Sequence, residues 1–293
     1  LYAPDNTPGN KTLFSKSVAR TLLAKIYAEK PLRDYTKVIQ YCDEVKADGF
    51  DLVDDFSDLF GMNAAGTDAK MRNTKESILE AQFTSGAGNW CTWMFGRDLV
   101  NWNNNFTWAK WVTPSRDLIS AFKQEGDEVR FKESIVYYDC NWSNYYPSDN
   151  YPFMYKCRSA NSSIIKYRYA DVLLLKAEAL IMQDTPDLEG AADIIDEVRD
   201  RAKLGALPTS VRSNKNVLLN ALLKERRLEL AFEGQRWFDL VRLDKVEEVM
   251  NAVYAKDSGR KAQIYTFDKN SYRLPIPQSV IDANDKIHQN PGY

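Results

Sequence analysis

The chain has 293 residues, enough to bury a substantial hydrophobic core in one large domain or in two. Its 39 basic and 41 acidic residues give a net charge of −2, which argues against a nucleic-acid-binding surface. The sequence has no apolar run of about 18 residues, so no transmembrane helix is expected.

Two helix hairpins are predicted at about 11–49 and 166–205, because apolar residues recur there at the steps of an amphipathic helix. Gly49 and Gly205 are expected to end them, since glycine accepts the left-handed backbone of a helix C-terminus. LLAKIYA in the first hairpin aligns with LLLKAEA in the second. Each hairpin is close to the ~34-residue length of a tetratricopeptide unit, which predicts an interrupted array of such units. The alternative is that two amphipathic hairpins look alike by chance.

An irregular section at about 64–163 is rich in Asn, Gly, Ser and aromatic residues, which predicts loops and short elements, with a helix at 117–123. Five of the seven tryptophans lie within residues 90–111, and a tyrosine-rich stretch follows at 137–155. Flat indole faces beside Asn and Arg suit both the C–H face and the hydroxyl rim of a sugar. The alternative is that these aromatic residues fill the core around the loops. The predicted ligand-binding residues are Trp90, Trp93, Trp102, Arg97, Asn101, Asn103, Tyr145 and Tyr146.

A third helix pair is predicted at about 214–254, where residues 225–243 mix Arg and Glu with apolar residues at helical spacing. Gly234 predicts a tight break between the two helices. Charges packed beside such a break are expected to be paired, because an unpaired buried charge is very costly. We therefore predict an ion-pair clamp; the alternative is a site for an anion. The proline-rich tail at 273–293 is predicted to be extended.

Catalytic and metal-binding motifs are sparse in this chain. His288 is the single histidine, and a Ser-His-Asp or Cys-His arrangement would have to include it. HExxH, EF-hand, P-loop and GxGxxG motifs are missing from the sequence, so no metal and no cofactor is expected. Glycoside hydrolysis needs only two carboxylates, and a glycoside hydrolase therefore remains the alternative to a protein without catalytic activity.

The stretch ERR-x-EL-x-FEG-x-RW-x-DL-x-R at 225–242 resembles the signature of the SusD/RagB family. Further segments resemble the family in the expected order, at 50–83, 166–179, 195–204 and 272–293. Asp171 departs from the pattern, since glutamate is usual there. Members of this family are surface lipoproteins of Gram-negative bacteria that capture nutrients for an outer-membrane transporter.

The resemblance implies one mainly α-helical, SusD-like domain over residues 1–293, in which tetratricopeptide-like hairpins form an α/α superhelical scaffold. It implies non-catalytic capture of an oligosaccharide at the cell surface, for delivery to a SusC-like TonB-dependent transporter. Family members are usually much longer, so the chain is expected to be truncated at its N-terminus. The only expected membrane attachment is a lipid anchor outside this chain. Because some members capture peptides, a peptide- or protein-binding helical module is another alternative.

Overall fold

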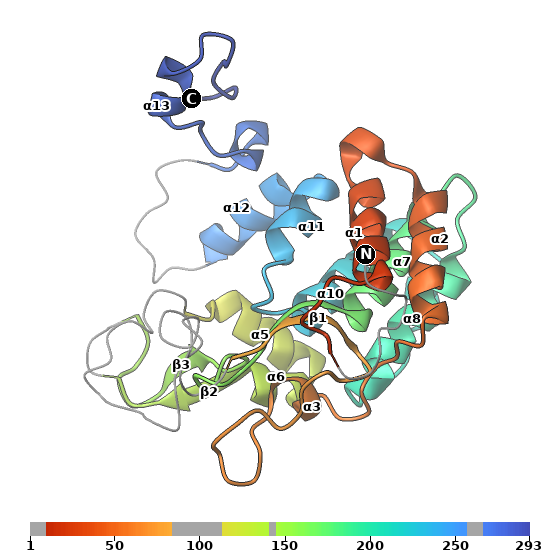
Figure 1. The fold of residues 1–293 in the computed structure, drawn as a ribbon, viewed down its shortest axis with the longest axis vertical. Helices are drawn as coiled ribbons and strands as arrows, with labels where there is room; N and C mark the ends of the chain where they lie inside the picture. The colour runs from red at the N-terminus through yellow and green to blue at the C-terminus, as the bar shows by residue number, and fades with distance from the viewer. Residues whose placement is uncertain (1–9, 84–112, 141–144, 257–265) are drawn as a thin grey trace. The chain divides into compact units, whose positions relative to one another are not determined.

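The computed structural model describes residues 10–83, 113–140, 145–256 and 266–293, and the structural statements below concern those residues. The chain divides into two compact units, Leu1–Gln235 and Arg236–Tyr293. The described residues are mainly α-helical with a few short strands, which confirms the predicted fold class (Figure 1).

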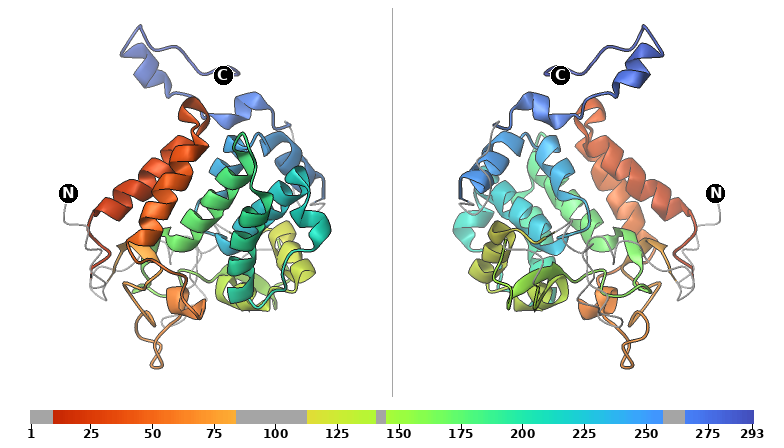
Figure 2. Two further views of the ribbon diagram at one scale, coloured as in Figure 1. Left: turned by 90° about the vertical axis from the view of Figure 1, so that its right-hand side faces the viewer. Right: turned by 90° about the vertical axis from the view of Figure 1, so that its left-hand side faces the viewer.

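The first predicted hairpin is confirmed by α1 (Lys16–Ala28) and α2 (Tyr35–Ala47), which pack side by side (Figure 2). Ser15 starts α1 by accepting a hydrogen bond from the backbone N–H of Val18 at 3.3 Å. A short 3₁₀ turn, η1 (Lys30–Leu32), connects the helices. Gly49 follows α2 with φ of +92°, in the left-handed region expected of it.

The second hairpin is confirmed by α7 (Tyr169–Met182) and α8 (Leu188–Arg201), but the expected role of Gly205 is wrong. Lys203 takes the left-handed conformation instead, with φ of +61°. The N–H groups of Lys203 and Leu204 donate to the carbonyls of Asp200 and Arg199 at 2.8 and 2.9 Å. These two bonds form a Schellman motif that ends the helix before the glycine is reached.

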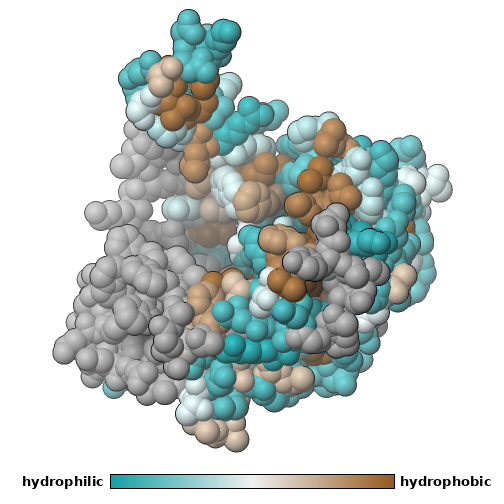
Figure 3. Space-filling model, in the orientation of Figure 1, coloured by the Kyte–Doolittle hydropathy of each residue, from teal (hydrophilic) through white to brown (hydrophobic). Residues whose placement is uncertain are grey.

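The largest hydrophobic core lies among α1, α2, α7, α8 and α10 (Lys215–Glu229). Helix α7 is buried on nearly all sides because its sequence, YADVLLLKAEALIM, is apolar around most of its circumference. By contrast, α1 leaves Leu22 and Ile26 exposed, and Figure 3 shows hydrophobic surface where α1 lies. The comparison of these hairpins with tetratricopeptide units stays a prediction.

The section predicted as irregular contains more regular structure than expected. It contributes α5 (Arg116–Glu125), which confirms the predicted helix, and α6 (Glu128–Ser134). Strand β1 (Ser77–Ala81) pairs antiparallel with β4 (Ile164–Arg168), so residues 167–168 are strand instead of the predicted helix. Strand β2 (Ile135–Tyr138) pairs antiparallel with β3 (Tyr151–Met154). The pairing of β1 with β4 joins segments far apart in sequence, which local patterns do not reveal. The short helices α3 (Ser57–Phe60) and α9 (Thr209–Arg212) complete this unit.

The second unit contains α11 (Arg236–Arg242), α12 (Val246–Lys256), the 3₁₀ turn η3 (Lys269–Tyr272) and α13 (Gln278–Asp282). The second helix of the pair predicted at about 214–254 is wrong as one helix: it is divided into α11 and α12, because the chain turns at Asp244 with φ of +55°. The extended tail is also wrong at α13. Pro277 stands just before this helix, where its missing N–H costs no intrahelical hydrogen bond.

Candidate functional site: a pocket along α5 and a buried ion network

A pocket of about 460 Å³ lies along one face of α5 in the first unit. Ser115 begins the helix by accepting a hydrogen bond from Leu118 N–H at 3.1 Å, and Gly126 follows its end with φ of +69°. The buried side chains Leu118 and Phe122 fix the orientation of the helix against the core. Residues at steps of three and four therefore share the opposite, pocket-facing side. They are Arg116, Ser120, Lys123 and Gln124; Ile119, which is buried in the core beside Leu118 and Phe122, also lines the pocket.

The other wall of the pocket comes from β2 and from the segment that leads into β3. Tyr137 on β2 contributes to it, together with Tyr146, Pro147 and Asn150. The hydroxyl of Tyr146 donates to the carbonyl of Pro114 at 2.7 Å, which ties this wall to the start of α5. Burial raises the pKa of Tyr137, so this phenol stays neutral at physiological pH.

Arg116 organises the two tyrosines that the sequence predicted as ligand-binding residues. Its guanidinium carbon lies 4.1 Å from the ring centroid of Tyr145 and 4.6 Å from that of Tyr146, within cation–π range. The same guanidinium donates to the backbone carbonyl of Tyr145. The two rings stand edge to face, with centroids 4.9 Å apart and planes at 89°. Tyr146 thus lines the pocket, while Tyr145 supports Arg116.

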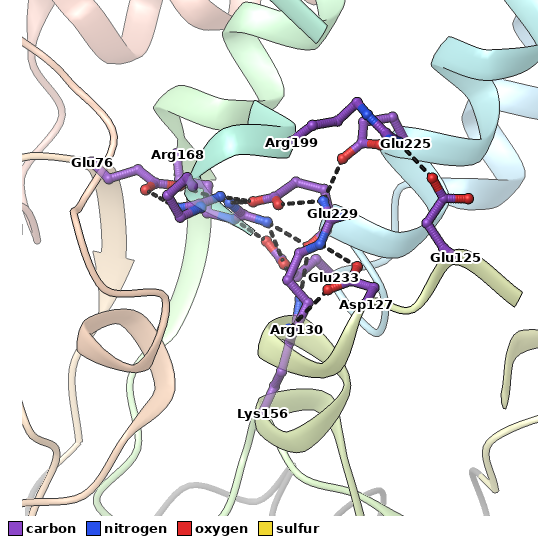
Figure 4. A network of polar contacts seen from close by, with 11 residues as sticks. Glu76, Glu125, Asp127, Arg130, Lys156, Arg168, Arg199, Glu225, Glu229 and Glu233 are labelled. Atoms are coloured by element: carbon purple, nitrogen blue, oxygen red, sulfur yellow. Dashed lines mark hydrogen bonds and ion pairs between the residues drawn. The ribbon is translucent and has the colours of Figure 1, made fainter. Parts of the chain in front are cut away.

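A second polar constellation is a buried ion network centred on Glu229, near the end of α10 (Figure 4). Its carboxylate accepts hydrogen bonds from Arg168 of β4 at 2.5 Å and from Arg130 of α6 at 3.0 Å. Arg201 of α8 also donates to it. Burial alone would raise the pKa of Glu229, but the three guanidinium groups hold that pKa well below its usual range.

Further carboxylates complete the pairing of these arginines. Glu76, beside β1, accepts from Arg168 at 2.7 Å and from Arg201 at 2.8 Å. Glu225 accepts from Arg130 at 2.5 Å, and Glu233 accepts from Arg168 at 2.7 Å. Lys156, which stands over the rings of Phe56 and Phe60, donates to Glu233 at 2.6 Å.

The predicted pairing of ions in the charged stretch is confirmed. Besides Glu229 and Glu233, Arg226 donates to Asp171 at 2.7 Å and Arg227 to Asp117 at 2.6 Å. The network ties α10 to β1, β4, α6 and α8, elements that the sequence did not indicate as partners. Because protein carboxylates already accept hydrogen bonds from these cations, the structural role is favoured over an anion site.

The tryptophan-rich part of the predicted site, with Trp90, Trp93, Trp102, Arg97, Asn101 and Asn103, lies outside the described residues. Tyr145 and Tyr146 are described, and only Tyr146 of the two lines the pocket. The sequence analysis did not single out the polar residues of α5. Their spacing of three and four residues within a predicted helix does indicate that they share one face. The ligand-binding role of all eight residues stays a prediction.

Groups that could support catalysis or metal binding give no further site in the described part of the chain. His288 is exposed in the second unit. Within the described ranges, no three His, Cys, Asp or Glu residues gather in a way that could hold a metal ion. No helix there is long and apolar enough to cross a membrane.

The model of the SusD family matches residues 146–293, slightly more than half of the chain. The chain therefore belongs to the SusD family, which confirms the resemblance seen in the sequence.

Two relatives from Formosa agariphila match parts of the chain. SusD-like protein P38 is 43% identical over 99 residues, which cover 32% of this chain and 19% of that protein. SusD-like protein P2 is 36% identical over 143 residues, which cover 46% of this chain and 27% of that protein. The matched segments are thus only a small part of either relative.

Solved structures share the fold over nearly the whole chain. A SusD superfamily protein from Parabacteroides distasonis is 23% identical with a TM-score of 0.73, covering 96% of this chain and 64% of that one. A laminarin-binding SusD-like protein is 24% identical with a TM-score of 0.68, covering 96% and 63%. Surface glycan-binding protein A from Bacteroides thetaiotaomicron, in complex with laminarihexaose, is 20% identical with a TM-score of 0.72, covering 96% and 65%. The chain thus spans less than two thirds of each of these structures.

Proposed function

We propose that this protein captures an oligosaccharide at the bacterial cell surface without chemically changing it. The observation that carries the proposal is the α5 pocket, which is lined by the aromatic residue Tyr146 and by the polar residues Ser120, Gln124 and Asn150. An aromatic ring offers a flat apolar surface to the C–H face of a sugar. Hydroxyl and amide groups can both donate hydrogen bonds to sugar hydroxyls and accept them.

The pocket is built in a way that favours binding. The Tyr146 hydroxyl is held by Pro114 at 2.7 Å, and its ring meets the ring of Tyr151 edge to face at 5.5 Å. A side chain held in place before the ligand arrives loses less conformational entropy on binding. Two similar proteins are named for binding laminarin or a surface glycan, which supports a glycan as the ligand class.

The tryptophan-rich stretch of sequence at 90–111 would supply the remainder of the site. Trp90, Trp93 and Trp102 would act as stacking platforms, and Arg97, Asn101 and Asn103 as partners of sugar hydroxyls. Tyr145 and Tyr146 would form a second edge. This assignment is motivated by the density of tryptophan, Asn and Gly in one stretch of sequence.

The proposed partner is a SusC-like TonB-dependent transporter in the outer membrane, to which the protein would deliver the glycan. Membership of the SusD family supports this partner and a lipid-anchored position on the cell surface. We propose no catalytic step, because His288 is exposed and no catalytic motif accompanies it in the sequence.

A glycan array followed by calorimetry tests the proposal. Replacing Tyr146, Trp90, Trp93 or Trp102 by alanine should weaken glycan binding. The loss in binding free energy should be about 2 kcal/mol or more where the residue is a hot spot. Phe14→Ala is the matched control, because Phe14 is an exposed aromatic residue that does not line the pocket. If all four variants fold and keep full affinity, the ligand site lies elsewhere. Release of reducing ends from the bound glycan would contradict the absence of catalysis.

A further inference from the structure

Helix α5 presents three different sides to its surroundings. Leu118 and Phe122 pack in the hydrophobic core, and the pocket lies along another side. The two carboxylates of the helix, Asp117 and Glu125, lie on a third side, because they are about two helical turns apart. This third side faces α8 and α10, whose basic residues bind both carboxylates.

The first carboxylate holds the start of α5. Asp117 accepts a hydrogen bond from Arg227 of α10 at 2.6 Å. Their side chains are 22% and 20% exposed, so water screens this pair less than it would screen a pair on the open surface. Asp117 directly follows Arg116, which lines the pocket. The pair with Arg227 therefore fixes the helix at the point where the lining residues begin.

The second carboxylate holds the end of α5 through two helices at once. Glu125 accepts a hydrogen bond from Arg199 of α8 at 2.6 Å and is paired with Lys224 of α10. Arg199 also donates to Glu225 at 3.3 Å, and Glu225 belongs to the buried network around Glu229 (Figure 4). The side chains of Glu125 and Arg199 are only 13% and 12% exposed. A single arginine thus connects the last turn of the pocket helix to the buried ion network.

Apolar packing and ion pairs constrain a helix in different ways. The hydrophobic effect is non-directional, so Leu118 and Phe122 hold α5 against the core without fixing its rotation closely. Charge-assisted hydrogen bonds are short and directional, so pairs at both ends fix the rotation of the helix and its position along its own axis. That rotation sets the distance between the polar residues Ser120 and Gln124 and the other wall of the pocket, to which Tyr146 belongs.

We propose that Asp117 and Glu125 are positioning residues of the α5 pocket. The inference rests on the proposed glycan capture and adds the residues that hold one wall of the site in register with the other. Neither carboxylate is among the described residues that line the pocket. Both act through α5, by keeping its polar side chains where a sugar can reach them and Tyr146 together. A binding site needs such support, because its groups must be held within roughly 0.5 Å of the productive geometry.

Calorimetry on neutral variants of the same shape tests this inference. The probe is the oligosaccharide that the wild type binds most tightly in an array of glucan, galactan, mannan and xylan fragments. Asp117→Asn and Glu125→Gln should each weaken its binding about three- to fivefold, the factor that a partly exposed ion pair is worth. Arg227→Gln should have the same effect as Asp117→Asn. Combining these two changes should cause no further loss, because both break one pair.

Glu44→Gln is the matched control. Glu44 of α2 accepts a hydrogen bond from Arg20 of α1 at 2.8 Å, and its side chain is 34% exposed. It is not among the described residues that line the pocket, so the same chemical change there should leave the affinity unchanged. The measurements are made where urea unfolding shows every variant to be fully folded. Under that condition a residue that only stabilises the fold has no effect on affinity.

The outcomes separate this inference from the proposed function. Weaker binding by both α5 variants, with full affinity in Glu44→Gln and no further loss in the double variant, supports the inference. Full affinity in either α5 variant, an equal loss in Glu44→Gln, or additive effects of Asp117→Asn and Arg227→Gln overturn it. Glycan capture still stands in those cases if Tyr146→Ala weakens binding. Failure of the wild type to bind any oligosaccharide of the array overturns the proposed function itself.

Discussion

Replacing Glu229 by glutamine should strongly destabilise the first unit. The side chain of Glu229 is fully buried, and its carboxylate is the shared acceptor of Arg130, Arg168 and Arg201. Glutamine keeps the shape of the side chain but removes the negative charge. Three buried guanidinium groups would then share one anion fewer, although Glu76, Glu225 and Glu233 remain.

The expected loss is about 3–5 kcal/mol in the free energy of unfolding, the range for breaking a buried ion pair. For a unit of this size, each kcal/mol lowers the melting temperature by about 2–4 °C, so the shift should be about 6–20 °C. Reversible urea unfolding, with the midpoint and slope fitted for wild type and variant, measures the free energy directly.

Glu189→Gln provides the matched control. Glu189 pairs with Arg212 at the surface, its side chain is 72% exposed, and Arg212 also pairs with Asp193 and Asp196. The same chemical change there should cost about 1 kcal/mol or less. If Glu229→Gln were as mild as Glu189→Gln, the buried network would not be a major source of stability and our reasoning would be refuted.

Three further predictions concern acid, alkali and catalysis. Burial would raise the pKa of Asp171 and of Glu229, but Lys25 and the neighbouring arginines hold both well below their usual range. The stability that these two groups contribute should therefore be complete above about pH 4.5 and should decline below it, as urea unfolding at stepwise lower pH would show. Burial lowers the pKa of Lys156 to about 8, against 10.5 in an unfolded chain, although Glu233 opposes the shift. Between pH 8 and pH 10.5 the unfolded state then binds more protons than the folded state. The free energy of unfolding should therefore rise with pH across this range in wild type but not in Lys156→Met. Parallel plots of unfolding free energy against pH for the two proteins would contradict this assignment. His288→Ala should change neither glycan affinity nor any measured turnover, and hydrolysis that disappears in this variant would show that the protein is an enzyme.

Much of the helical framework was predictable because it depends on neighbours in sequence. Capping at Ser15 and at Gly49 uses groups within a few residues of the helix end. The same local rules favoured Gly205 over Lys203 and so misplaced the end of α8, where the hydrogen-bond pattern of the last turn decided the outcome.

The pairing of ions in the charged stretch at 225–243 was predictable from the sequence, but the partners were not. The mixture of Arg and Glu with apolar residues predicted paired ions, and the pairs are present. Their partners could not be named, because Glu229 meets residues 61 and 99 positions away in the chain. Likewise, Tyr146 was singled out from its tyrosine-rich surroundings, whereas Lys123 was not.

The sequence alone determined the helical periodicity, the end of α2, the pairing of charges in principle and the family, because each depends on short segments with their own chemistry. Only the tertiary structure decided which carboxylate meets which guanidinium, and that α5 and the segment leading into β3 enclose a pocket. It also decided that the acids of α5 face α8 and α10 while its basic residues face that pocket. These arrangements depend on packing between segments distant in the chain, where burial makes pairing of charges necessary but does not specify the partner.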